Sequence, residues 1–199
     1  MTMALDDASD LPDEALLVLY ANGDAAAARA LTLRLVPRLL AYSTRLLGGD
    51  RAEAEDVAQE SMLRLWRIAP DWRRGEAQVS TWLYRVATNL CTDRLRARRL
   101  RRPVTLEDAP ELASEAADAE TRLIEGDRQA ALSAALAELP DRQRQAVVLR
   151  HIEGLTNPEI AAVMDIGVEA VESLTARGKR GLAALLAGRR PDLGYGEGD

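Results

Sequence analysis

The chain has 199 residues and a formal net charge of −6, with 26 Lys and Arg residues against 32 Asp and Glu. It contains no run of about 18 apolar residues, which excludes a transmembrane helix, and its acidic first residues lack the basic and apolar regions of a secretory signal. Cys91 and His151 are the only residues of their types, which excludes an intrachain disulfide and disfavours a Cys–His zinc site or a Ser–His–Asp triad, so we expect a cytoplasmic protein without metal or cofactor.

Helical periodicity dominates the sequence, and no stretch alternates apolar and polar residues as a strand would, so we expect an all-α fold. Two helices, 12–22 and 24–47, are separated by Gly23, and Pro37 is expected to kink or divide the second. Asp50 begins a third helix, which has acids in its first turns and ends before Pro70.

The next helix, residues 80–102, concentrates positive charge in an otherwise acidic chain. Ser80 is expected to cap it. It carries seven arginines against one acid, Asp93, which leaves a local net charge of +6. Arginine pairs phosphates in a bidentate way and stacks on bases, so the cluster favours a nucleic-acid surface over a merely solvated basic face.

Residues 103–127 reverse this balance, with eight acids against Arg122 alone. Their composition is typical of a flexible acidic linker, with helix expected only towards its end. A second helical block is expected over 128–188, and residues 189–199 are expected to form a disordered tail.

The second block predicts a helix-turn-helix. A helix ends near Gly154, and a short helix follows in which Thr156 and Glu159 fit a capping box. After a turn at 165–167, a longer helix should place Val168 and Val171 inward and its Ser, Thr, Arg and Lys residues outward. Such an outer helix fits the DNA major groove, although a helical hairpin with solvated arginines would share the pattern.

Three segments, in this order, resemble those of RNA polymerase sigma factors of the extracytoplasmic-function (ECF) group. They are AEDVAQESMLRLWR, STWLYRVATNLCTDRLRARRLRR and the block from LPDRQRQAVVLRHIEG to ESLTARGKRGL. The resemblance implies two helical domains, 12–102 (sigma region 2) and 128–188 (sigma region 4), joined by the acidic linker 103–127. It also implies a non-enzymatic initiation factor that binds core polymerase, melts the −10 promoter element and reads the −35 element.

The resemblance assigns residues to three surfaces. Residues that match the helix docking on the β′ clamp helices of core polymerase are Asp56, Gln59, Glu60, Leu63 and Trp66. Residues matched to the −10 element are Trp82, Arg85, Asn89, Arg94, Arg96, Arg98 and Arg99, with Asn89 holding a flipped base and Trp82 equally suited to packing. Residues matched to the −35 element are Thr156, Ser173, Ala176, Arg177, Lys179 and Arg180.

Two residues and one loop differ from the pattern that is common in the family. Glu172 and Leu174 stand where relatives commonly carry basic residues, which puts the strength and sequence of −35 recognition in question. The loop before Ser80 lacks an aromatic residue that many members carry there. Its polar residues, expected to contribute to −10 specificity, are Arg73, Arg74, Glu76 and Gln78.

The partners implied by the resemblance are core polymerase (β′ clamp helices and β flap), promoter DNA and an anti-sigma factor that wedges between the domains. Three other functions remain open from the residues. A helix-turn-helix regulator would bind operator DNA without polymerase, and an adaptor would bind only another protein. A helical hydrolase would use carboxylates such as Glu53, Asp56 and Glu60, but the chain lacks a phosphate loop and a nucleophile–base pair.

Overall fold

The structure is a computed structural model that describes residues 11–73, 75, 78–101 and 121–187. Within these ranges the regular elements are helices, which confirms the all-α prediction. The expected tail at 189–199 and residues 103–120 of the expected linker lie outside the described residues. Among the described helices, none combines the length and the apolar character that crossing a bilayer requires.

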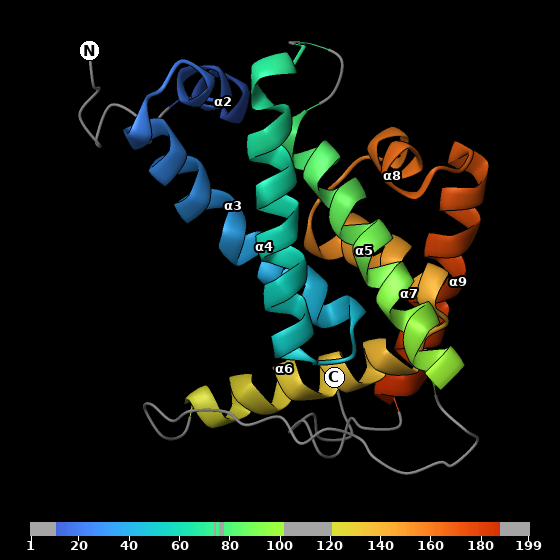
Figure 1. The fold of residues 1–199 in the computed structure, drawn as a ribbon. Helices are drawn as coiled ribbons and strands as arrows, with labels where there is room; N and C mark the ends of the chain where they lie inside the picture. Colours follow the sequence, from blue (N-terminus) through green and yellow to red (C-terminus); the bar gives the residue numbers. More distant parts are fainter. Residues whose placement is uncertain (1–10, 74, 76–77, 102–120, 188–199) are drawn as a thin grey trace.

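The N-terminal half folds as a helical bundle (Figure 1). Its elements are α2 (Asp13–Ala21), α3 (Ala25–Leu46), α4 (Arg51–Ile68), the short 3₁₀ turn η1 (Ala69–Asp71) and α5 (Val79–Arg101). Side-chain caps fix two of the starts, because the Asp24 carboxylate accepts from Ala26 N at 2.8 Å and the Asp50 carboxylate accepts from Glu53 N at 3.0 Å.

Two local expectations in this half need correction. Of the two outcomes expected at Pro37, a kink or a division, the division does not occur: Pro37 lies inside α3 on the exposed side, where the lost backbone hydrogen bond is tolerated. Ser80 does not cap α5, because the helix begins at Val79 and the Trp82 N–H already donates to the Gln78 carbonyl at 3.0 Å.

The C-terminal half contains the predicted helix-turn-helix. Its elements are α6 (Thr121–Glu138), α7 (Asp141–Val147), the π-helical turn η2 (Val148–Ile152), α8 (Asn157–Met164) and α9 (Val168–Ala187). Asp165 ends α8 in the left-handed conformation, with φ 53°. Val171 is fully buried as expected, but Val168 is 40% exposed because it lies in the first turn of α9, beside the connection from α8.

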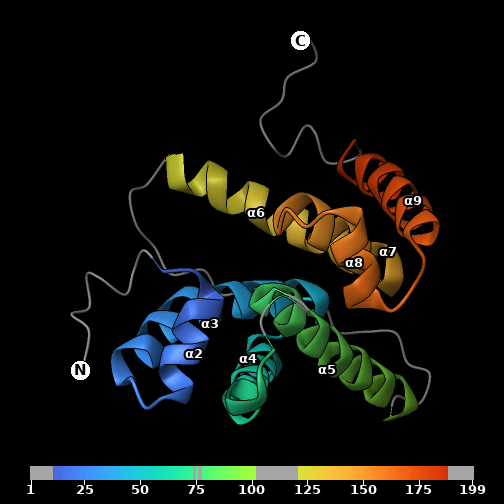
Figure 2. The ribbon, with the colours of Figure 1, turned by 90° about the horizontal axis from the view of Figure 1, so that it is seen from above.

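The two halves pack as two layers (Figure 2). Helices α2 to α5 form one layer, α6 to α9 form the other, and α8 packs against α5 where the layers meet. Buried leucines fill the interior of both layers, and the buried apolar residues form one continuous cluster that runs from Leu16 to Val171. The helices assigned to DNA binding, α5 and α9, therefore pack on the same continuous apolar core.

Candidate functional site

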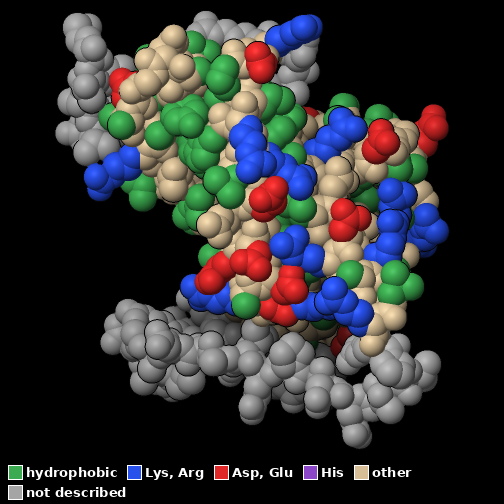
Figure 3. Space-filling view, viewed as in Figure 1, with side chains coloured by type: hydrophobic (Ala, Val, Ile, Leu, Met, Phe, Trp, Pro, Cys, Tyr) green, Lys and Arg blue, Asp and Glu red, His purple; other side chains and the backbone are tan. Residues whose placement is uncertain are grey.

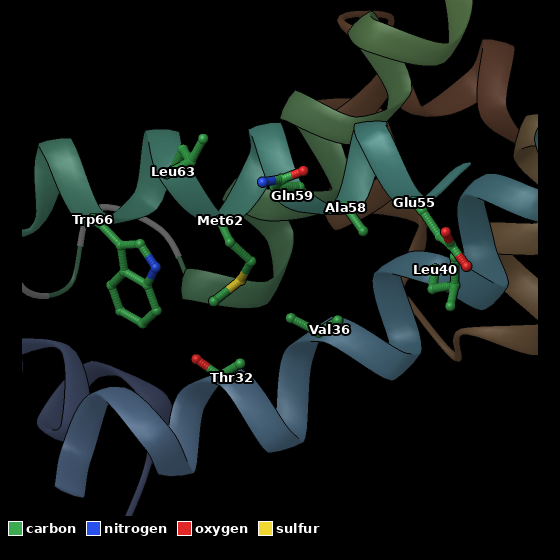
Figure 4. Close-up of a pocket in the computed structure, with 9 residues that line it drawn as sticks. All are labelled: Thr32, Val36, Leu40, Glu55, Ala58, Gln59, Met62, Leu63 and Trp66. Carbon is green, nitrogen blue, oxygen red and sulfur yellow. The ribbon is translucent and has the colours of Figure 1, made fainter. Parts of the chain in front are cut away.

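An apolar groove of about 330 Å³ lies between α3 and α4. In Figure 4, Met62 and Trp66 of α4 point towards Thr32 and Val36 of α3, and Leu40 and Glu55 close the other end. Trp66 is half-buried and contacts Tyr20, with ring centroids 4.4 Å apart. The groove has the shape and chemistry of a seat for apolar side chains from another protein.

The residues predicted for protein docking lie together on α4. Asp56, Gln59, Glu60 and Leu63 have the spacing of one helix face, and Leu63 is 41% exposed on the outer side of the groove. Glu60 accepts from Arg64 Nε at 2.9 Å across one helical turn, an exposed contact that a partner could replace at little cost. The helix therefore presents acids beside an apolar groove.

Helix α5 presents Arg85, Asn89 and Arg96 as exposed side chains. Trp82 is half-buried and stands edge-on to Trp72, with centroids 6.0 Å apart, so packing accounts for its position. In the preceding loop Arg73 and Gln78 are exposed, whereas Arg74 and Glu76 lie outside the described residues. The exposed Asn89 amide can both donate to and accept from a base edge.

Three of the arginines predicted to track phosphates form ion pairs with carboxylates. Arg94 Nε lies 2.5 Å from Glu53, Arg98 pairs with Asp50, and Arg99 Nη2 lies 2.7 Å from Asp141. The first two acids belong to the start of α4 and its cap, and the third begins α7 of the other half. Figure 3 shows acidic (red) and basic (blue) side chains adjoining over the start of α4 and the end of α5.

Beneath the exposed face of α5, a polar and aromatic core fixes the helix. The Tyr42 hydroxyl and Thr88 Oγ1 lie 2.6 Å apart, and Thr88 also donates to the Tyr84 carbonyl at 2.6 Å. Cys91 is fully buried, and this burial raises the pKa of its thiol to about 12. The thiol therefore remains protonated and unreactive near neutral pH, and Cys91 serves as a core residue.

The outer surface of α9 presents its Ser, Arg and Lys side chains, whereas Thr175, which was expected to face outward, is half-buried with its hydroxyl oxygen inside. Ser173, Ala176, Arg177 and Arg180 have the spacing of one face, all are exposed, and Lys179 is exposed beside them. Figure 3 shows Lys and Arg side chains gathered over this helix. Small residues followed by cations suit a helix that reads base edges and holds phosphates.

The start of α8 contributes the remaining predicted DNA contact. Thr156 is exposed, and its backbone N–H and hydroxyl both donate to Glu159, at 2.7 and 2.6 Å. These hydrogen bonds lower the pKa of Glu159. The backbone one also forms half of the expected capping box, whose other half is the Thr156 side chain accepting from the Glu159 N–H. Glu172 accepts from Asn157 Nδ2 at 3.4 Å and is exposed, while Leu174 packs against the core.

Sequence reasoning missed two parts of these surfaces. The α3 wall of the groove was not predicted, although Thr32, Val36 and Leu40 recur every four residues and could have indicated a second apolar face. The acids that pair with Arg94, Arg98 and Arg99 were also missed. Each acid lies at least forty positions from its arginine, so the local net charge of the helix does not reveal the pairing.

Comparisons with known proteins match both halves of the chain. A family profile described as "Sigma-70 region 2" matches residues 31–101, and one described as "Sigma-70, region 4" matches residues 129–182. The RNA polymerase sigma-H factor of Pseudomonas aeruginosa is 32% identical, over 87% of this chain and 93% of that protein. The ECF RNA polymerase sigma factor SigM of Mycobacterium tuberculosis is 34% identical, over 87% and 84%.

Solved structures share the fold. CnrH, solved in complex with the cytosolic domain of CnrY, is 26% identical and superposes with a TM-score of 0.64 over 88% of this chain and 97% of its own. The sigma factor RpoE of Bartonella quintana, solved with the anti-sigma factor NepR, is 21% identical, with a TM-score of 0.63 over 80% and 96%. The latter likeness supports the helical architecture alone.

Proposed function

The chain belongs to the ECF group of RNA polymerase sigma factors, and we propose which of its surfaces bind core polymerase and which bind promoter DNA. Like its relatives, it binds core RNA polymerase and directs promoter-specific initiation. The match over both halves of the chain carries this conclusion, because a regulator or adaptor would need only one of them. We assign polymerase binding and recognition of the −10 element to residues 12–102, and recognition of the −35 element to residues 128–188.

The α4 face and its groove form the proposed docking site for the β′ clamp helices. Asp56, Gln59 and Glu60 supply polar and acidic groups beside the apolar surface of Leu63 and Trp66. Charge complementarity at such a site steers a basic partner and fixes its register, while the groove buries apolar side chains. The acids serve docking in this assignment, so no hydrolytic role is proposed for them.

Helices α5 and α9 form the proposed promoter surfaces. Asn89 would hold a base flipped from the −10 element, and the arginines of α5 would contact phosphates after exchanging their carboxylate partners for DNA. On α9, Ser173 and Ala176 would lie against base edges, while Arg177, Lys179 and Arg180 would hold the backbone. Glu172, held by Asn157, lies beside this surface and would bias the −35 sequence it accepts.

An anti-sigma factor is the proposed inhibitor, and the cytoplasm, where core polymerase acts, is the proposed compartment. CnrH, which is 26% identical to this chain, was solved bound to the cytosolic domain of a second protein, CnrY, and this supports a protein partner of that kind here. An inhibitor that competes for the α4 groove or holds the domains together would block polymerase and DNA at once.

Run-off transcription tests the function directly. Bacterial core polymerase is incubated with a pool of genomic fragments, with and without the purified chain. New transcripts that share two upstream elements at fixed spacing are expected. No new transcripts, combined with sequence-specific binding of duplex DNA by the chain alone, would instead identify an operator-binding regulator.

A further inference from the structure

An acidic residue, Glu172, lies on the face of α9 that is assigned to DNA. At 100° per residue, Glu172, Ala176 and Arg180 fall within about 80° of one another around the helix. The buried residues Val171 and Gly178 lie about 140° and 160° from Ala176, on the opposite side. Glu172 therefore shares its direction with residues assigned to the −35 element, and its side chain is exposed.

The position of Glu172 along α9 places it close to base edges. The helix begins at Val168, so Glu172 lies in its second turn, and the N-terminal residues of the outer helix of a helix-turn-helix contact base edges in the major groove. The cations Arg177, Lys179 and Arg180 follow one to two turns later, where they can hold phosphates. The order of residues thus assigns the carboxylate to the bases and the cations to the backbone.

Asn157 of the preceding helix orients this carboxylate. Helices α8 and α9 pack against each other (Figure 1), and Asn157 Nδ2 donates to Glu172 Oε1 at 3.4 Å. Asn157 is the first residue of α8, directly after the Thr156 cap, so the capping box fixes its backbone. The contact restrains one carboxylate oxygen and leaves Oε2 to accept a hydrogen bond from a base.

A carboxylate in the major groove selects among bases because it can only accept hydrogen bonds. Guanine presents N7 and O6 and thymine presents O4, which are acceptors and repel it. Adenine places the N7 acceptor beside its N6 amino donor, whereas cytosine presents its N4 amino donor with no acceptor of its own in the groove. A desolvated carboxylate without a donor is costly, so cytosine is the base that suits Glu172.

We propose that Glu172 makes this chain select cytosine at one position of the −35 element. Its Oε2 accepts a hydrogen bond from the cytosine N4 amino group, and Asn157 is a positioning residue that acts through Glu172. This inference deepens the proposed function and rests on it, because it requires α9 to lie in the major groove of the −35 element.

The test is transcription by the complete holoenzyme, which is core polymerase with the full-length chain. The template pool carries a promoter found by run-off transcription, with its −10 element fixed, its −35 element randomised and a downstream barcode that is sequenced in the transcripts. At one −35 position, wild type should use templates with C about tenfold more than templates with G or T, because a specific base-edge contact discriminates by about this factor.

Glu172→Gln gives the sharpest result, because glutamine pairs with adenine N6 and N7 in a bidentate way. The preferred base at that position should change from C to A, while the other positions keep their preferences, and Glu172→Ala should lose the preference there. Asn157→Ala should weaken the preference for C about threefold without changing its identity, since the base alone must then immobilise the carboxylate. The matched variant Glu169→Gln, at an exposed acid one turn earlier, should keep the preference for C.

Two results would overturn this role of Glu172. One is a wild type without a preference for C at any −35 position, or a Glu172→Gln variant that keeps this preference, because Glu172 would then only face solvent. The other is loss of the preference in Glu169→Gln alone, which would assign the reading to Glu169. A wild type that directs no promoter-specific transcription contradicts the proposed function and this inference with it, whereas an active wild type with either result contradicts only the role of Glu172.

Discussion

Asn89 is the single residue on which promoter melting is expected to depend most. Its amide is exposed on α5, one turn from the exposed Arg85, and a flipped base needs hydrogen bonds that offset a few kcal/mol of unstacking. Asn89→Ala should reduce open-complex formation by about tenfold or more, measured by permanganate footprinting, and leave affinity for core polymerase unchanged. Asp93→Ala, at another exposed position of α5, is the control. Equal loss of polymerase binding would refute the assignment.

Cys91 should behave as an inert core residue. Burial raises the pKa of its thiol to about 12, so the reactive thiolate at pH 8 is far scarcer than in the unfolded chain. Labelling by Ellman's reagent should be slower than in urea by about a hundredfold or more. Above pH 9 the unfolded chain loses this proton before the folded chain does, so stability should fall as pH rises towards 12. Rapid labelling of the folded protein would instead show that the Cys91 thiol is accessible and reactive.

At the scale of elements, the acidic face of α4 should control polymerase binding. Asp56→Arg combined with Glu60→Arg places like charges against a basic partner, so affinity for core polymerase should fall by about tenfold or more. Fluorescence titration with core polymerase measures this affinity. Asp71→Arg combined with Glu169→Arg makes the same charge change at exposed acids outside α4 and should have little effect. Unchanged affinity in the α4 variant would discard the docking site.

The orientation of α9 depends on a glycine. A Cβ at Gly178 would lie 2.5 Å from Val147 Cγ2 and 3.0 Å from the Gln143 carbonyl oxygen, whereas one at Gly181 would meet only Leu139 Cδ2, at 2.9 Å. Gly178→Ala should lower the free energy of unfolding by about 1–2 kcal/mol, because overpacking against α7 outweighs the gain of about 1 kcal/mol in helix propensity. Gly181→Ala, which displaces a flexible side-chain end, should be closer to neutral in urea unfolding. Equal effects would contradict this packing argument.

At the scale of the molecule, the sequence predicted the helices and their ends far better than it predicted the contacts between helices. The helix start at Asp50, the capping box at Thr156 and Glu159, and the turn after α8 follow from a few neighbouring residues, so the sequence predicted them well. The groove and the interface between halves depend on how helices separated by many residues dock. Nothing near Glu153 in the sequence indicates that it would meet Tyr84, 69 positions away, and the pairing of Arg99 with Asp141 is equally non-local.

This docking gives a thermodynamic prediction for the whole chain. Because one apolar cluster runs through both layers, the halves should unfold together, and scanning calorimetry of wild type should give one transition with equal calorimetric and van't Hoff enthalpies. Glu153→Lys places a cation beside Arg45 and removes the acceptor for Tyr84, which should uncouple the halves and split the transition in two. Glu169→Lys should keep a single transition. Two transitions in wild type would contradict this prediction, because they would mean that the halves unfold independently.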